Sequence, residues 1–71
     1  MNKYIKAFDE YYVASKISYI GKVEKVKTLE GDNYWFFVII CDGYRLNVGW
    51  EQTEQDVIGA REAFVGVFNN G

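Results

Sequence analysis

The chain of 71 residues has no histidine, a single cysteine and no apolar run of transmembrane length. Without histidine it lacks the side chain that most often serves as a general base or a metal ligand. The single cysteine, Cys41, cannot form an internal disulfide, so we expect a reducing compartment, with an intermolecular bridge as the minor alternative. The apolar run at residues 34–41 is far shorter than the about 20 residues that a membrane span requires.

The first residues also lack the apolar segment of a secretory signal. We therefore expect a protein of the cytoplasm, or of the host cytoplasm if the protein is viral, without a membrane partner. Residues 1–30 hold six lysines against four acids, which gives +2, and residues 31–71 hold two arginines against six acids, which gives −4. The sum is the net charge of −2, and an acidic chain is a poor general binder of nucleic acid unless a local basic patch forms.

No catalytic motif is present. Cys41 has no imidazole partner and lies in an apolar run, so we expect it to pack rather than react. Ser15 and Ser18 stand in no recognisable nucleophile motif. The acidic residues match no calcium loop, and the glycines form no phosphate-binding pattern. We therefore expect no enzyme activity, no cofactor, no catalytic residue and no metal site.

Composition favours one globular domain over residues 1–71, with 49% hydrophobic, 18% aromatic and 25% charged residues. A helical stripe over residues 4–15 predicts an amphipathic N-terminal helix. Its members are Tyr4, Ile5, Phe8, Tyr11, Tyr12 and Ser15. From Ile17 onward the rhythm becomes that of a strand, and its change of phase predicts a β-bulge or a bend near Glu24–Lys25.

Two turn signals predict two hairpins. Asp42–Gly43 suits a type I′ turn, which pairs residues whose numbers add up to 85 and places Trp35 opposite Trp50. An earlier two-residue loop at 31–32 would pair residues whose numbers add up to 63. Strand 44–50 alternates between apolar and polar residues, so we expect one buried face and one exposed face.

A second helix is predicted after Thr53, a natural N-cap. The expected fold is α+β: helix, three-stranded antiparallel β-meander, helix (α-β-β-β-α), with the helices packed on the sheet. The apolar stripe of the second helix comprises Val57, Ala60, Phe64, Val67 and Phe68. The predicted core comprises Trp35, Phe37, Leu46, Val48 and Phe64.

Strand 34–41 is apolar on both faces. The face opposite the predicted core carries an apolar stripe that something must cover. The stripe comprises Tyr34, Phe36, Val38 and Ile40. One helix on each face would cover it within the chain. With both helices on the core face, the stripe would meet another protein or a second copy. A nucleic-acid strand stacking on Tyr34 and Phe36 is the third possibility, with Lys25, Lys27 and Arg45 on its phosphates.

The favoured expectation is a small, non-enzymatic protein-binding module that acts stoichiometrically as an inhibitor or regulator. Its partner would be another protein or a second copy in a homodimer. Size and acidity associate such chains with phage-encoded factors against host defence or transcription. In a variant of this hypothesis the chain mimics nucleic acid, although a solvated helix face explains its acids as well. The acids that would imitate phosphates are Glu51, Glu54, Asp56 and Glu62. The alternatives are a single-stranded nucleic-acid-binding domain and a structural homo-oligomer subunit. The candidate partner-binding residues are Tyr34, Phe36, Val38, Ile40, Lys25, Lys27, Arg45, Glu51 and Glu54.

Overall fold

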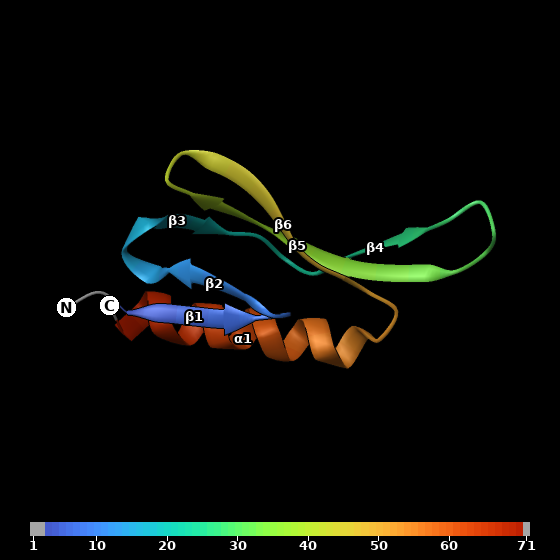
Figure 1. Ribbon diagram of the computed structural model, residues 1–71. Coiled ribbons are helices and arrows are strands. Elements are labelled where there is room, and N and C mark those ends of the chain that lie inside the picture. Colours follow the sequence, from blue (N-terminus) through green and yellow to red (C-terminus); the bar gives the residue numbers. More distant parts are fainter. Residues whose placement is uncertain (1–2, 71) are drawn as a thin grey trace.

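The computed structural model describes residues 3–70, apart from the side chain of Asn70. This part of the chain is a small α+β domain of six antiparallel strands in two sheets, followed by one C-terminal helix (Figure 1). The elements are β1 (Tyr4–Ala7), β2 (Glu10–Val13), the 3-10 helix η1 (Ala14–Lys16), β3 (Ile17–Ile20), β4 (Glu24–Lys27), β5 (Asn33–Cys41), β6 (Tyr44–Glu51) and α1 (Glu54–Asn70).

The expected N-terminal helix is wrong, and so is the order α-β-β-β-α. The segment forms the hairpin β1–β2, in which Ala7 pairs with Glu10 across the loop Phe8–Asp9. Both loop residues have positive φ, 50° and 65°, as a type I′ turn requires. The segment is rich in tyrosine and β-branched residues, which favour strands over helices. Phe-Asp lacks the glycine or asparagine that usually marks such a turn, and the residues of the segment also happen to have helical spacing, so the hairpin was not predicted.

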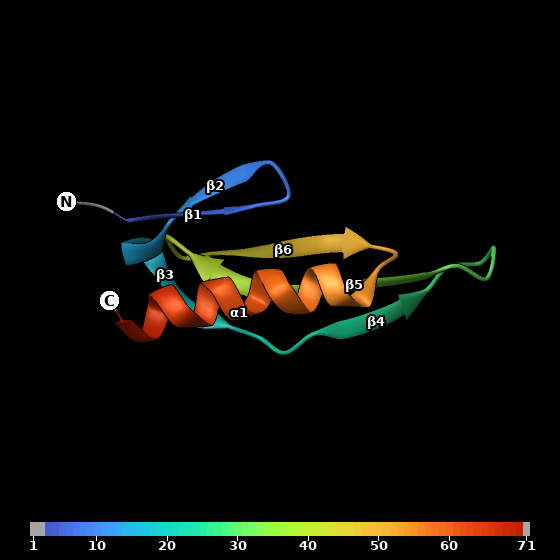
Figure 2. The same ribbon diagram turned by 90° about the horizontal axis from the view of Figure 1, so that it is seen from below.

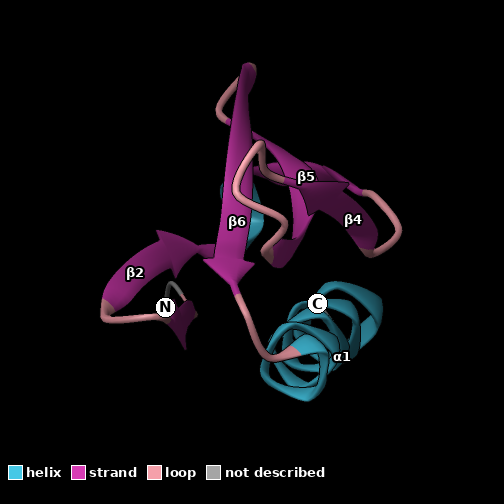
Figure 3. Cartoon of the chain, turned by 90° about the vertical axis from the view of Figure 1, so that its right-hand side faces the viewer, coloured by secondary structure: helices cyan, strands magenta, loops and turns pink. Residues whose placement is uncertain are grey.

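The hairpin β1–β2 and the helix α1 lie together beneath the same side of the larger sheet (Figure 3). Phe64 of α1 is fully buried there, with its ring centroid 5.4 Å from that of Phe37 and 5.2 Å from that of Tyr12, both edge-on. The buried cluster comprises Ile5, Ala7, Ile17, Phe37, Ile39, Val48, Val57 and Phe64. Burial of Phe37, Val48 and Phe64 confirms most of the predicted core; Trp35 packs at its edge, and Leu46 remains 38% exposed.

The predicted apolar stripe of α1 is confirmed except at its end. The helix begins directly after Thr53, as expected, and Val57 and Phe64 are fully buried. Ala60 and Val67 pack against the same cluster. Phe68 is 43% exposed, because the sheet does not extend to the last turn of the helix (Figure 2).

β5 is the central strand of the larger sheet, with β6 on one edge and β3 and β4 on the other. β3 and β4 together form one interrupted strand along β5. Between them the Gly21 amide donates a hydrogen bond of 2.7 Å to the Val38 carbonyl. Nε of Arg61 in α1 donates one of 2.6 Å to the Gly21 carbonyl. The irregularity predicted at Glu24–Lys25 therefore lies elsewhere: the register with β5 shifts between Ile17 and Tyr19, and the strand is interrupted by a bend at residues 21–23, where the helix holds it.

The β5–β6 hairpin has the predicted turn and most of the predicted register. Asp42 and Gly43 have φ values of 55° and 83°, and the pairing from Cys41 with Tyr44 to Phe36 with Gly49 keeps the predicted sum of 85. Beyond Phe36 the register shifts by one residue, and Trp35 pairs with Glu51. The predicted pairing of Trp35 with Trp50 is therefore wrong, because a β-bulge at the end of β6 reverses the direction of Trp50.

The β4–β5 hairpin has a different loop from the predicted one. Thr28 and Asp32 close a loop of residues 29–31, in which Gly31 has a φ of 93°. Lys27 then pairs with Asn33, so paired residue numbers add up to 60 instead of 63. A shift by an odd number moves every side chain of β4 to the other face of the sheet. This hairpin also extends past α1 and gives the molecule its length of 44 Å (Figures 1 and 2).

Candidate binding surface on the outer face of the sheet

The face of the larger sheet that is turned away from α1, here called the outer face, carries alternate residues of β5. No helix or strand of residues 3–70 packs on this face (Figure 3). Its β5 residues are Tyr34, Phe36, Val38 and Ile40, and none belongs to the buried core cluster. Val38 is nevertheless only 7% exposed, whereas the other three are partly exposed. Register adds Tyr19 from β3, Glu24 and Val26 from β4, and Arg45 and Asn47 from β6.

An aromatic cluster occupies one end of the outer face. The Trp50 ring stacks on Tyr34 at a centroid distance of 5.6 Å and an interplanar angle of 14°. It also lies 5.6 Å from Phe36 at 46°. Gly49, with a φ of 112°, and Trp50, with a φ of 64°, form the bulge that turns the indole to this side. Trp50 keeps 49% of its surface exposed, so the cluster offers aromatic area to a partner.

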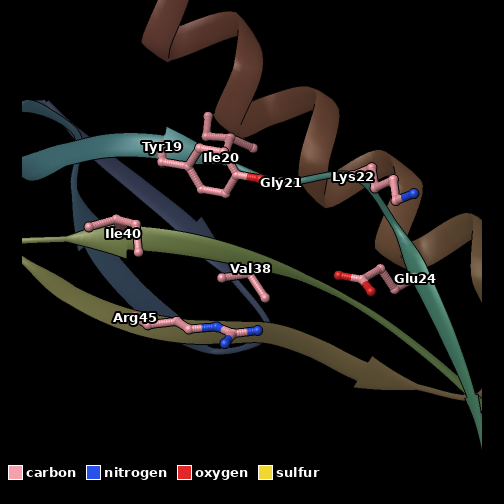
Figure 4. Close-up of a pocket in the computed structure, with 8 residues that line it drawn as sticks. All are labelled: Tyr19, Ile20, Gly21, Lys22, Glu24, Val38, Ile40 and Arg45. Atoms are coloured by element: carbon pink, nitrogen blue, oxygen red, sulfur yellow. The ribbon is translucent and has the colours of Figure 1, made fainter.

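A shallow groove of about 420 Å³ continues the surface beyond the cluster (Figure 4). It opens beside the bend at residues 21–23. Val38 and Ile40 form its apolar floor together with the ring of Tyr19, while Glu24 and Arg45 stand on opposite sides of Val38. The full lining comprises Tyr19, Ile20, Gly21, Lys22, Glu24, Val38, Ile40 and Arg45. The outer face is therefore an apolar surface with both signs of charge at its margin.

The structure brings some of the predicted binding residues together and separates others. Tyr34, Phe36, Val38, Ile40 and Arg45 share the outer face. The predicted basic residues of β4 do not join them. Their expected places were opposite Val38 and Phe36, but the changed loop moves both to the other face of the sheet. These residues are Lys25, which pairs with Trp35, and Lys27, which pairs with Asn33.

The predicted acidic residues also lie elsewhere. Glu51 pairs with Trp35, whose side chain packs against the core, and Glu54 begins α1. The outer face also contains Trp50, Tyr19 and Glu24, which were not among the predicted binding residues. A glycine inside a strand pattern signals a bulge, so Gly49 was the signal that could have identified Trp50.

Away from the outer face, Tyr12 has a strongly altered acidity. Its partial burial against Phe64 raises its pKa from 10.0 to about 12, and the hydrogen bond of 3.0 Å from its hydroxyl to Glu10 contributes in the same direction.

The free thiol of Cys41 packs at the edge of the core. Within residues 3–70 no cluster of three or more potential ligands could hold a metal ion. In the same range, the helix is too short or too polar to cross a bilayer.

Comparisons with protein families, with curated proteins and with solved structures find no match for this chain. Its function must therefore be inferred from its own residues.

Proposed function

We propose that the chain is a small, non-enzymatic protein-binding module that acts stoichiometrically, as an inhibitor or regulator, through the outer face of its sheet. One observation carries the proposal: no helix or strand of the described chain packs on this apolar face, whereas α1 and the β1–β2 hairpin both pack on the opposite face. Contiguous exposed apolar surface marks interaction sites. Tryptophan, tyrosine and arginine are also the residues most enriched among binding hot spots, and Trp50, Tyr34 and Arg45 supply one of each.

The single-stranded nucleic-acid alternative has less support. A strand stacked on Tyr34 and Phe36 would need cations along its phosphates. Lys25 and Lys27 lie on the opposite face of the sheet, and Glu24 stands beside Phe36 in their place. Glu24 would repel a phosphate at the position where the predicted register had a lysine to attract one.

A charge placed in the middle of the outer face tests the proposal. A tagged wild-type chain is co-expressed with an untagged copy, and the proteins captured with it, its own copy included, are identified. We expect Val38→Arg to abolish capture, because an unpaired charge inside a contact is strongly unfavourable. Leu46→Arg is the matched control, since Leu46 is 38% exposed and its partner in the register, Ile39, belongs to the core face.

The two variants must first be shown to fold, by circular dichroism and thermal melting. Equal capture by wild type, Val38→Arg and Leu46→Arg would contradict binding through the outer face. Oligonucleotide binding that falls steeply with salt and is lost in Val38→Arg would instead support the nucleic-acid alternative.

A further inference from the structure

Arg45 and Glu24 flank Val38 from opposite sides of the outer face (Figure 4). Arg45 pairs with Ile40, two residues from Val38 along β5, on the β6 side. Glu24 pairs with Phe36, two residues from Val38 in the other direction, on the β4 side. Val38 therefore lies at the middle of the line from Arg45 to Glu24. Both charged residues are exposed, and within residues 3–70 the structure records no ion pair for either.

A surface with this arrangement is complementary to itself. A two-fold axis can lie parallel to the sheet, pass over Val38 and run perpendicular to the line from Arg45 to Glu24. Rotation about this axis places Arg45 of each copy over Glu24 of the other. The two grooves, each with Val38 in its floor, then face one another between the two pairs. Self-complementarity is what a closed two-fold dimer requires of its interface. A different partner would impose no such symmetry on the charges.

We propose that the outer face binds a second copy of this chain, in a two-fold dimer with Val38 at the axis and two reciprocal Arg45–Glu24 ion pairs. This inference rests on the proposed function, because it names the protein that the surface binds. Arg45 and Glu24 are displaced by about 13 Å along the strands and about 10 Å across them. These similar displacements make the two sheets cross steeply, closer to the orthogonal than to the aligned class of sheet packing.

Charge reversal in separate chains tests the reciprocal pairs. Arg45→Glu and Glu24→Arg each place like charges opposite one another at both pairs of the dimer. We expect each single variant to raise the dimer dissociation constant by at least about tenfold, because like charges brought together across an interface are unfavourable. Analytical ultracentrifugation over a concentration series measures this constant. The double variant, Arg45→Glu with Glu24→Arg, should dimerise as the wild type does.

Mixing the two single variants separates pairing between chains from pairing within a chain. A heterodimer of Arg45→Glu with Glu24→Arg has opposite charges at both pairs, so we expect the equimolar mixture to recover the wild-type dissociation constant. If residues 24 and 45 instead paired within one chain, mixing would not restore dimerisation. In each single variant these two residues carry charges of the same sign, and mixing does not change that. The melting temperature of each variant reports whether its fold is intact.

A wild-type chain that remains monomeric at its highest soluble concentration would overturn the second-copy inference. Single variants that dimerise as tightly as the wild type would also overturn it, as would a mixture that fails to recover. None of these results removes the proposed function, because a different protein captured by the wild type and lost in Val38→Arg would still identify the outer face as a binding surface. The proposed function fails only when Val38→Arg leaves every capture unchanged.

Discussion

The two faces of β5 carry the same kinds of side chain in different surroundings. On the core face, Phe37 and Ile39 are fully buried beneath α1 and the β1–β2 hairpin. On the outer face, Phe36 and Ile40 remain partly exposed, and Val38 between them is 7% exposed. The residue types cannot distinguish the faces, since each has a phenylalanine and an isoleucine in the same strand. The two faces differ only in the elements that pack on them. An apolar pattern therefore shows that a face favours burial, but it does not show whether the same chain or a partner buries it.

The largest difference in stability between variants of the two faces should come from an arginine placed at either of two adjacent residues, Ile39 on the core face and Val38 on the outer face. Ile39→Arg puts a guanidinium into the fully buried core, and we expect the domain to unfold, because domains of this kind are stable by only about 5–15 kcal/mol. Val38 is only 7% exposed but lies in the floor of the open groove, so the long side chain of Val38→Arg can extend through the groove to solvent, and the fold should persist. Far-UV circular dichroism and amide NMR spectra measure both outcomes. Unfolding of both variants would show that the outer face is covered within the chain.

Truncation of adjacent phenylalanines should give a smaller but measurable contrast. Phe37→Ala removes a fully buried ring that contacts Phe64, and we expect it to lower the free energy of unfolding by about 3–5 kcal/mol. Phe36→Ala removes a partly exposed ring beside Trp50, and its cost should be on the order of 1 kcal/mol. Urea denaturation of the two variants provides the comparison. Equal costs would contradict the difference in cover between the two faces.

The bulge that places Trp50 on the outer face should depend on Gly49. An added Cβ would lie 3.2 Å from the Trp35 carbonyl oxygen and 3.2 Å from a Val57 methyl carbon, at a φ of 112°. We therefore expect Gly49→Ala to destabilise the fold by about 1–3 kcal/mol. Gly59→Ala is the control: nothing lies within 4 Å of its added Cβ, and it should stabilise α1 by up to about 1 kcal/mol.

Urea denaturation measures the stability of the two glycine variants. A Gly49→Ala variant as stable as Gly59→Ala would show that the bulge does not require glycine.

The predictable parts of the fold are those in which local and tertiary signals agree. Asp42–Gly43 sets a turn whose register also agrees with the alternation in β6, and the pairing was therefore predicted correctly up to Phe36. The β1–β2 hairpin was missed because its turn residues, Phe8 and Asp9, adopt positive φ without the glycine or asparagine that would signal it. The surrounding tyrosines happen to have helical spacing, and only the strand preference of these residues argued against a helix.

The candidate surface was predictable where it depends on alternation alone. Tyr34 and Phe36 are on the outer face because every second residue of one strand must share a face. Lys25 was misplaced because its face depends on the length of the loop that follows β4, for which Gly31 allows more than one length. Trp50 was misplaced because a bulge inverts the alternation beyond it. The wrongly predicted residues of the surface therefore lie on the neighbouring strands, where the face of a side chain depends on the strand register. The residues of the central strand were predicted correctly.

The smallest expected effect concerns the core side of the molecule, where partial burial raises the pKa of Tyr12 from 10.0 to about 12. Because the unfolded chain releases this proton first, the contribution of Tyr12 to stability is complete below about pH 10 and is lost as the pH rises towards 12. Tyr12→Phe keeps the ring beside Phe64 and removes the titrating hydroxyl, so its stability should decline less steeply above pH 10. Urea denaturation midpoints across the alkaline range measure the two slopes. Parallel slopes in wild type and variant would show that burial on the core side does not hold this hydroxyl in its neutral form.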